Sequence, residues 1–130
     1  METLNMNETF IHILKGNKIS NGDERDIQNV CSLSFFKIDN PTDTHPNQWE
    51  IHPDGDELLL VTNGKLEVEI VTGTNYLKVV PHNPEIKKVI VNSGESIIVK
   101  KGHWHRLLLQ KPTSLIVAGF RENSKLSPVI

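Results

Sequence analysis

The stretch KLEVEI, residues 65–70, alternates strictly between charged and apolar side chains. Alternation with a period of two is typical of a half-buried β-strand. The preceding residues TNG, 62–64, include Asn and Gly, which readily adopt positive φ, so they predict a turn. The apolar run LLLV, 58–61, lies before that turn, and the sequence therefore predicts a hairpin over 58–70.

Short apolar runs separated by turn residues continue along the rest of the chain. Many short strands with turn signals about every 8–12 residues are typical of a β-sandwich or β-barrel. The best candidate for a helix is a short turn over 23–28. We expect further strands at 9–14, 31–38, 76–80, 86–91, 96–100, 106–109 and 115–120, with turns at 72–75 and 111–112.

The length and composition favour a single domain whose net charge is close to zero. The chain has 130 residues and a formal net charge of −2, whereas nucleic-acid binders usually carry a basic stripe. No apolar run approaches the ~20 residues of a membrane span, and residues 1–7 lack the pattern of a signal peptide. We therefore expect a cytoplasmic single-domain protein that binds neither nucleic acid nor membrane. We expect a flexible N-terminal end at 1–8, one folded domain over 9–122 and a C-terminal tail at 123–130.

Two segments carry polar residues where a plain strand would be apolar. In an extended chain Glu50 and His52 lie on the same face, because side chains alternate. The loop at 53–55 then turns the chain, and Glu57 leads into the next apolar run, so these three side chains can converge. Further along, His105 opens another apolar strand. Buried charge is costly unless it is paired or ligating, and imidazole and carboxylate are good ligands for Fe, Mn, Zn, Ni or Cu.

The spacing of these residues resembles the two motifs of the cupin family. Four residues separate His52 from Glu57 and six separate Glu57 from Gly64, which matches the second half of the first motif. The segment 94–105 begins with a glycine, has another at position 102 and ends in His105, which matches the second motif. Two partial motifs in the right order on an all-β chain make the resemblance fairly specific.

The chain departs from the family pattern at four positions. Thr44 stands in place of the opening glycine of the first motif, Lys100 replaces the proline of the second, and Leu109 replaces its asparagine. Glu50 stands where the family has its first ligating histidine. The last difference changes the set of ligands that the resemblance implies.

The resemblance implies a single-domain all-β fold, the cupin-type double-stranded β-helix or jelly-roll barrel, around a divalent transition metal (Fe, Mn, Zn or Ni). It implies that His52, Glu57 and His105 are metal ligands, with Glu50 as the fourth. If Glu50 points away, the other three form a two-histidine, one-carboxylate set with open positions, which suits O₂ chemistry. Glu50 or Glu57 is also a candidate proton carrier. In the alternative interpretation His52 only hydrogen-bonds a carboxylate and no metal binds.

Trp49 and Trp104 lie next to these polar residues in the sequence. Large aromatic side chains beside a polar site often shape a small-molecule pocket, so both are candidates for lining a substrate pocket at the barrel mouth. The alternative is that both pack in the core.

Three functions are compatible with the resemblance. The first is a metal-dependent enzyme acting on a small polar or aromatic molecule, dioxygenase-like or sugar isomerase- or epimerase-like. The second is a non-catalytic barrel that binds a sugar-like molecule without metal. The third is an assembly role: similar small barrels commonly pair through N-terminal strands, so we expect a homodimer in which strand 9–14 is covered.

Overall fold

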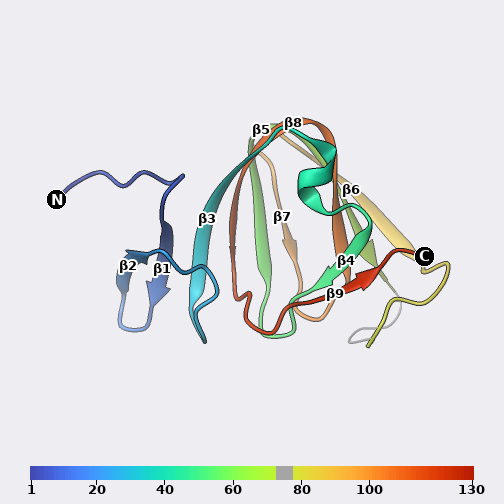
Figure 1. Cartoon of the computed structure of the whole chain (residues 1–130), viewed down its shortest axis with the longest axis horizontal. Coiled ribbons are helices and arrows are strands. Elements are labelled where there is room, and N and C mark those ends of the chain that lie inside the picture. The colour runs from blue at the N-terminus through green and yellow to red at the C-terminus, as the bar shows by residue number, and fades with distance from the viewer. Residues whose placement is uncertain (73–77) are drawn as a thin grey trace.

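Nine β-strands and one short 3₁₀ helix form the regular structure of the described residues, 1–72 and 78–130, in this computed structural model (Figure 1). The strands predicted at 31–38, 86–91 and 96–100 are confirmed to within one residue. The turn expected at 72–75 and the strand expected at 76–80 lie largely outside the described residues, and 78–80 are not in a strand. The elements are β1 (Phe10–Leu14), β2 (Lys18–Gly22), β3 (Cys31–Ile38), η1 (Pro41–Thr44), β4 (Gln48–Ile51), β5 (Glu57–Val71), β6 (Ile86–Asn92), β7 (Ser96–Val99), β8 (His105–Gly119) and β9 (Lys125–Pro128).

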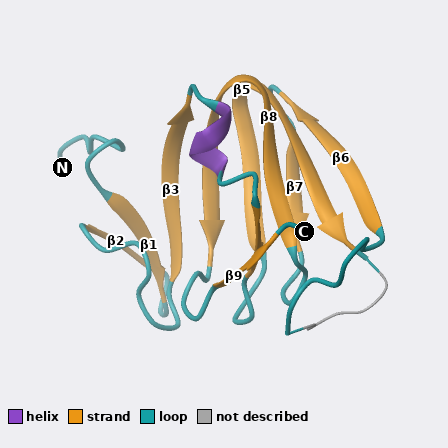
Figure 2. Cartoon of the chain, turned by 45° about the vertical axis from the view of Figure 1, so that its right-hand side comes forward, coloured by secondary structure: helices purple, strands orange, loops and turns teal. Residues whose placement is uncertain are grey.

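The strands form one antiparallel sheet that curls around an interior, with the β1–β2 hairpin at one side (Figure 2). The main path runs β2-β1-β3-β8-β4-β9, and β5 pairs with β6, β7 and β8. β5 and β8, each 15 residues long, pair from Glu57 opposite Gly119 to Ile70 opposite His105. The all-β fold predicted from the alternation is therefore confirmed.

β5 is continuous, so the hairpin predicted over 58–70 is wrong. The turn residues at 62–64 form an irregularity in the register with β8 and do not reverse the chain. Gly64 has a φ of 120°, and a Cβ there would lie 2.4 Å from Thr113 Oγ1 and 2.6 Å from the carbonyl oxygen of Pro112. The turn signal therefore marks a bulge at which only glycine fits.

This bulge changes which side chains of β5 face the interior. Before it, the buried inward positions include Leu59 and Val61; after it, they include Leu66 and Val68. Because side chains alternate along a strand, a bulge exchanges the faces that odd and even positions occupy. An odd-numbered residue before the bulge therefore lies on the opposite face of the sheet from an odd-numbered residue after it.

β8 is also unbroken, so the two strands predicted at 106–109 and 115–120 are one. Pro112, which suggested the break, lies beside the register irregularity opposite residues 63–65. Proline is tolerated at such places, where the ladder of backbone hydrogen bonds is already interrupted.

The helix predicted over 23–28 is absent, and these residues form bends and turns. The helical turn lies instead at η1, where Pro41 occupies the first turn and the carboxylate of Asp43 accepts a hydrogen bond from the backbone N–H of Asn40. Such local caps stabilise a short turn that apolar periodicity does not reveal. Within the described residues, no helix has the length and apolar character needed to cross a membrane.

Two apolar clusters lie on the two faces of the sheet. Alternation along β4 places Trp49 and Ile51 on the face opposite to Glu50, and the pairing of Glu50 with His105 places these two polar side chains on the inner face. The outer cluster is Trp49, Ile51, Val71, Val80 and Trp104, and the inner cluster is Leu59, Val61, Leu66, Val68, Val91, Val99, Leu115 and Val117.

The C-terminal residues, expected to form a tail, include a strand. β9 pairs with β4 from Gln48 opposite Pro128 to Ile51 opposite Lys125. Ser127 is buried, and its Oγ accepts a hydrogen bond from the backbone N–H of Val80. This pairing helps to fix β4, the strand that carries the first polar residues of the candidate site.

Candidate metal centre

β4 and the loop after it position the first two polar residues. Glu50 faces the interior from β4, and His52 follows directly after the strand on the same side. The loop is fixed by hydrogen bonds to the β7–β8 turn, where Lys101 N–H donates to Asp56 Oδ1 (2.8 Å) and Gly102 N–H donates to the His52 carbonyl (3.1 Å). Asp56 therefore caps the loop and brings the two motif segments together.

The structure brings all four sequence-predicted ligands to one place. Glu57 opens β5 and His105 opens β8, both on the inner face. His52 Nε2 lies 2.9 Å from Glu57 Oε2 and 3.4 Å from Glu50 Oε1, and His105 Nε2 lies 3.3 Å from Glu57 Oε1. One nitrogen or oxygen atom from each of these four residues lies within 4.8 Å of the others.

Both imidazoles are oriented by hydrogen bonds at Nδ1. His105 Nδ1 lies 3.1 Å from the backbone carbonyl of His103, which can only accept, so Nδ1 carries the proton. His52 Nδ1 lies 2.6 Å from Ser124 Oγ. The Ser124 hydroxyl already donates to the carbonyl of Arg121, so it accepts from His52. With Nδ1 protonated on both rings, the Nε2 atoms that face Glu57 are the ones available as ligands.

The Nε2 atom of His52 is buried and has no hydrogen-bond partner among the described residues. Its contacts with the two carboxylates are close but lack hydrogen-bond geometry. Burial alone would lower the pKa of His52, but the adjoining carboxylates of Glu50 and Glu57 raise it to about 9. An unpartnered nitrogen beside two carboxylates is an environment that favours a cation, either a proton or a metal ion.

The carboxylates are held in their charged forms. Burial would raise the pKa of Glu57, but its close contacts with the imidazoles of His105 and His52 lower it well below its usual range. Burial also opposes ionisation of Glu50, yet the contacts with His52 and Arg121 lower its pKa. Both groups are therefore anionic at neutral pH.

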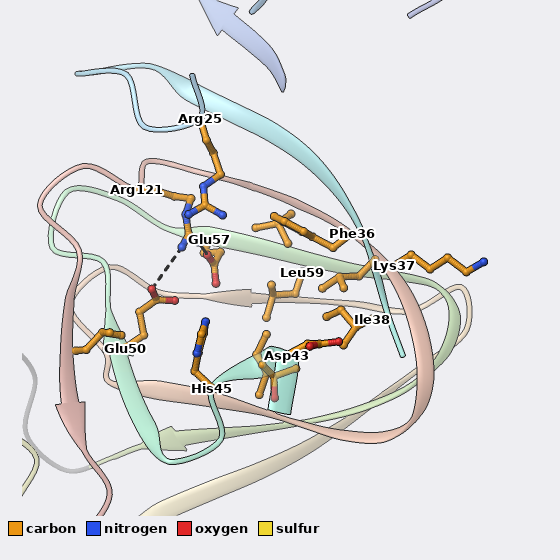
Figure 3. Close-up of a pocket in the computed structure, with 15 residues that line it drawn as sticks. Arg25, Phe36, Lys37, Ile38, Asp43, His45, Glu50, Glu57, Leu59 and Arg121 are labelled. Carbon is orange, nitrogen blue, oxygen red and sulfur yellow. Dashed lines mark hydrogen bonds and ion pairs between the residues drawn. The ribbon is translucent and has the colours of Figure 1, made fainter. Parts of the chain in front are cut away.

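A cavity of about 420 Å³ adjoins the candidate metal centre (Figure 3). Glu50, Glu57 and Arg121 line its polar end. The side chain of Glu50 is 30 % exposed, whereas those of His52, Glu57 and His105 are 2–4 % exposed, so Glu50 offers the most accessible carboxylate. Apolar walls come from Phe36, Ile38, Leu59, Leu107, Leu115 and Val117.

The two tryptophans do not line this cavity, contrary to the first interpretation of them. Trp49 and Trp104 are 2 % and 3 % exposed and pack in the outer cluster. The cause is the alternation on β4 and at the start of β8, because Glu50 and His105 take the inner face and their sequence neighbours take the outer one. Both tryptophans pack in an apolar cluster, which is the alternative considered for them.

A family model described as "Cupin" matches residues 7–127 of the chain. The chain belongs to the cupin family. The cupin motifs seen in the sequence are thus the segments that build the candidate metal centre. A comparison with curated protein sequences found no match.

Solved structures with the same fold differ widely in activity. A cupin-2 domain containing protein from Shewanella frigidimarina has 16 % identity, covers 71 % of this cupin and 72 % of its own chain, and has a TM-score of 0.46. An oxalate oxidase in complex with glycolate has 19 % identity, 77 % and 45 % coverage, and a TM-score of 0.50. Peruvianin-I, a cysteine peptidase from Thevetia peruviana latex, has 8 % identity, 78 % and 56 % coverage, and a TM-score of 0.52. At these identities the likeness to the last two structures shows the fold and not the activity.

Sequence reasoning missed Arg121, which belongs to the site of this cupin. Its Nη1 donates to Glu57 Oε2 (2.8 Å) and its Nη2 to Glu50 Oε2 (3.3 Å). A signal was present in the alternation of β8: Leu115, Val117 and Gly119 are buried at every second position, and Arg121 continues that series just beyond the strand. A cationic side chain at an inward-facing position of a strand is unusual, and it indicates a buried anionic partner.

Proposed function

We propose that this cupin binds one divalent transition metal through His52, Glu57 and His105, with Glu50 as a fourth ligand. We propose further that it acts on a small polar or aromatic molecule in the adjoining cavity, by dioxygenase-like or sugar isomerase- or epimerase-like chemistry. The observation that carries the proposal is the pair of buried Nε2 atoms that face Glu57 while both Nδ1 atoms are held as donors.

The residues fit such an ion in spacing and charge. Ligand atoms about 2.0–2.2 Å from one ion lie roughly 3–4 Å from each other, and three imidazole–carboxylate pairs here are 2.9, 3.3 and 3.4 Å apart. Two neutral imidazoles and two carboxylates balance the charge of a divalent ion. A set with two carboxylates favours Fe(II) or Mn(II) over softer ions.

The chain's own residues can then be given roles. A bound divalent ion would supply Lewis acidity to a substrate oxygen. Arg121 holds the carboxylates of Glu50 and Glu57 in place, since it bonds to both. Glu50 borders the cavity and is the most exposed of the four, so it is the group placed to accept a proton from a bound molecule.

The test is metal analysis of protein purified without a chelator, repeated after stripping and reloading with Fe(II), Mn(II), Zn(II) or Ni(II). We expect about one equivalent of metal per chain, and we expect His52→Ala and His105→Ala to lose it. His103→Ala is the matched control, because only the backbone carbonyl of His103 contacts the site. A folded protein that retains no stoichiometric metal after reloading overturns the proposal.

A non-catalytic barrel that binds a sugar-like molecule without metal is the second candidate. The observation that favours it is the ion-pair set itself, because Arg121 neutralises the carboxylates and His52 readily holds a proton. Thermal-shift screening separates the two candidates. Stabilisation by sugars that persists in the presence of a chelator supports the second, and stabilisation that requires metal supports the first.

We also propose that the protein is a homodimer. The β1–β2 hairpin lies at the edge of the sheet and exposes Ile13 and Ile19. Apolar side chains on an edge hairpin favour association with another strand. Light scattering at micromolar concentration tests this, and a monomer would contradict it.

A further inference from the structure

The polar end of the cavity holds a second arginine that the proposed metal chemistry does not use. Arg25, from the connection between β2 and β3, lines the cavity together with Arg121 (Figure 3). Arg25 Nε lies 3.3 Å and Arg121 Nε 3.6 Å from the same oxygen, Oδ1 of Asp26. The two guanidinium groups are therefore neighbours at the end of the cavity where Glu57 lies.

One of these guanidinium groups retains unused donors. The Arg121 group faces its own carboxylates, because Nη1 and Nη2 donate to Glu57 and Glu50 and the buried Nε lies 3.6 Å from Asp26 Oδ1. Arg25 uses Nε on Asp26, and its terminal nitrogens have no acceptor in the described part of the chain. Its side chain is 32 % exposed and its guanidinium lies 5.9 Å from the centre of the Phe36 ring, so it can be reached from the cavity. Free guanidinium donors match a carboxylate in geometry.

The charges of this cluster also favour an anion. Its carboxylates are Glu50, Glu57 and Asp26, and its cations are Arg25 and Arg121. Ligating imidazoles are neutral. With a divalent ion bound, four positive charges face three negative ones, and one monoanion restores neutrality. A group with one negative charge, such as a carboxylate, therefore matches better than a dianion such as a phosphate monoester.

The residues that line the rest of the cavity determine how a ligand is oriented and what chemical character its remaining part must have. Leu59, Phe36 and Ile38 lie between the arginines and η1, and Asp43 of η1 borders the cavity at a distance from the arginines (Figure 3). The carboxylate of Asp43 would repel an anionic group at its own end. The arginine end therefore favours an anion, and the apolar walls face the rest of the bound molecule.

We propose that the cavity binds a small organic monocarboxylate with an apolar body, and that Arg25 selects for its carboxylate. This inference rests on the proposed metal site, because the excess positive charge requires the ion. It assigns Arg25 to specificity, as a group that contacts the ligand and leaves the metal ligands unchanged.

The test compares benzoate with its neutral analogue benzamide by isothermal titration calorimetry on Mn(II)-loaded protein. We expect benzoate to bind at least about tenfold more tightly than benzamide, as a hydrogen bond to a charged group allows. Acetate, which lacks the apolar body, should bind more weakly than benzoate. Arg25→Gln should weaken benzoate binding about tenfold and leave benzamide binding within about twofold.

Lys37→Gln is the matched control, because Lys37 also lines the cavity but its ammonium group points away from it (Figure 3). This variant removes the same charge and should leave benzoate binding unchanged. Metal content and far-UV circular dichroism are measured on each variant. If metal-loaded protein binds benzoate no better than benzamide, or Arg25→Gln changes nothing, the carboxylate inference is wrong and the metal proposal stands. If the wild type holds no metal, both fall together.

Discussion

Two buried glutamates on β5 differ in one respect that separates a candidate metal ligand from a structural ion pair. Glu57 and Glu69 are both 3 % exposed, and each accepts a 2.8 Å hydrogen bond from an arginine, Arg121 or Arg106. Glu57 also faces the Nε2 atoms of two histidines. Glu69 faces instead the ammonium group of Lys88, 3.7 Å away.

The surroundings of Glu69 are those of a structural contact. Arg106 also donates to the carbonyl of Pro46 and lies 4.9 Å from the centre of a Trp49 ring, so the pair ties β8 and β5 to β4 on the outer face. The cations around Glu69 carry fixed protons, whereas an imidazole Nε2 atom beside Glu57 can take either a proton or a metal ion. The comparison teaches that a buried, arginine-paired carboxylate is not by itself evidence for a metal site.

We expect the largest effect on stability at the bulge in β5, which places the two glutamates on opposite faces of the sheet. Gly64→Val places a side chain against Thr113 and the carbonyl of Pro112 at a φ of 120°, so we expect a loss of about 4 kcal/mol in the free energy of unfolding, or failure to fold. Urea denaturation measures it. The control is Gly94→Ala, also at positive φ (83°) but with nothing within 4 Å, which should cost about 1 kcal/mol. Equal losses in the two variants would show that the bulge is not sterically constrained.

The next effect tests the difference between the glutamates directly. Glu57→Gln should lower metal affinity at least about 100-fold, because the shared anionic ligand is lost, while Glu69→Gln should keep one equivalent of metal. Metal content after reloading, with circular dichroism to confirm folding, measures both. Loss of metal from Glu69→Gln, or retention by Glu57→Gln, would contradict the distinction.

A smaller effect is expected on stability at the outer pair. Glu69→Ala leaves the largely buried Arg106 without its carboxylate, and we expect a loss of about 2 kcal/mol in the free energy of unfolding with metal content unchanged. Glu67→Ala is the control, since Glu67 lies on the same strand and has no ion pair in the described structure. If both variants unfold at the same urea concentration, the Glu69–Arg106 pair does not stabilise the fold.

The smallest effect concerns the orientation of one ligand. Ser124→Ala removes the acceptor for His52 Nδ1–H, so we expect metal affinity to fall about tenfold without loss of the site. Asn123→Ala, which removes a hydrogen bond to the exposed Asp54, is the neighbouring control and should leave the affinity unchanged. Competition with a chelator of known affinity measures both. An unchanged affinity for Ser124→Ala would mean that packing alone orients the ring.

Local sequence patterns predicted the strands and the four candidate ligands well, because alternation and motif spacing are short-range signals. The alternation at 65–70 is correct, and His52, Glu57 and His105 meet as the spacing implies. Continuity of β5 was not predictable in the same way. Turn residues at 62–64 are compatible with either a reversal or a bulge, and pairing with β8 decides between them.

Long-range pairing explains the remaining differences. Arg121 lies 64 residues from Glu57 in the chain, and no local pattern connects the two. The inner face of β4 is fixed by its pairing with β8 and β9, so the positions of Trp49 and Trp104 depended on a register that the sequence alone leaves open.

The hydrogen bond between Lys101 and Asp56 has a consequence for how the protein folds. It closes a loop of 45 residues, and the contact of His52 with Ser124 closes one of 72. Contacts between distant residues form late, because the entropy of closing long loops must be overcome before they form. We therefore expect the metal-binding geometry to form late in folding. An ion that binds this site would stabilise the folded state alone, and chelation should accelerate unfolding of the whole barrel without first melting any local segment.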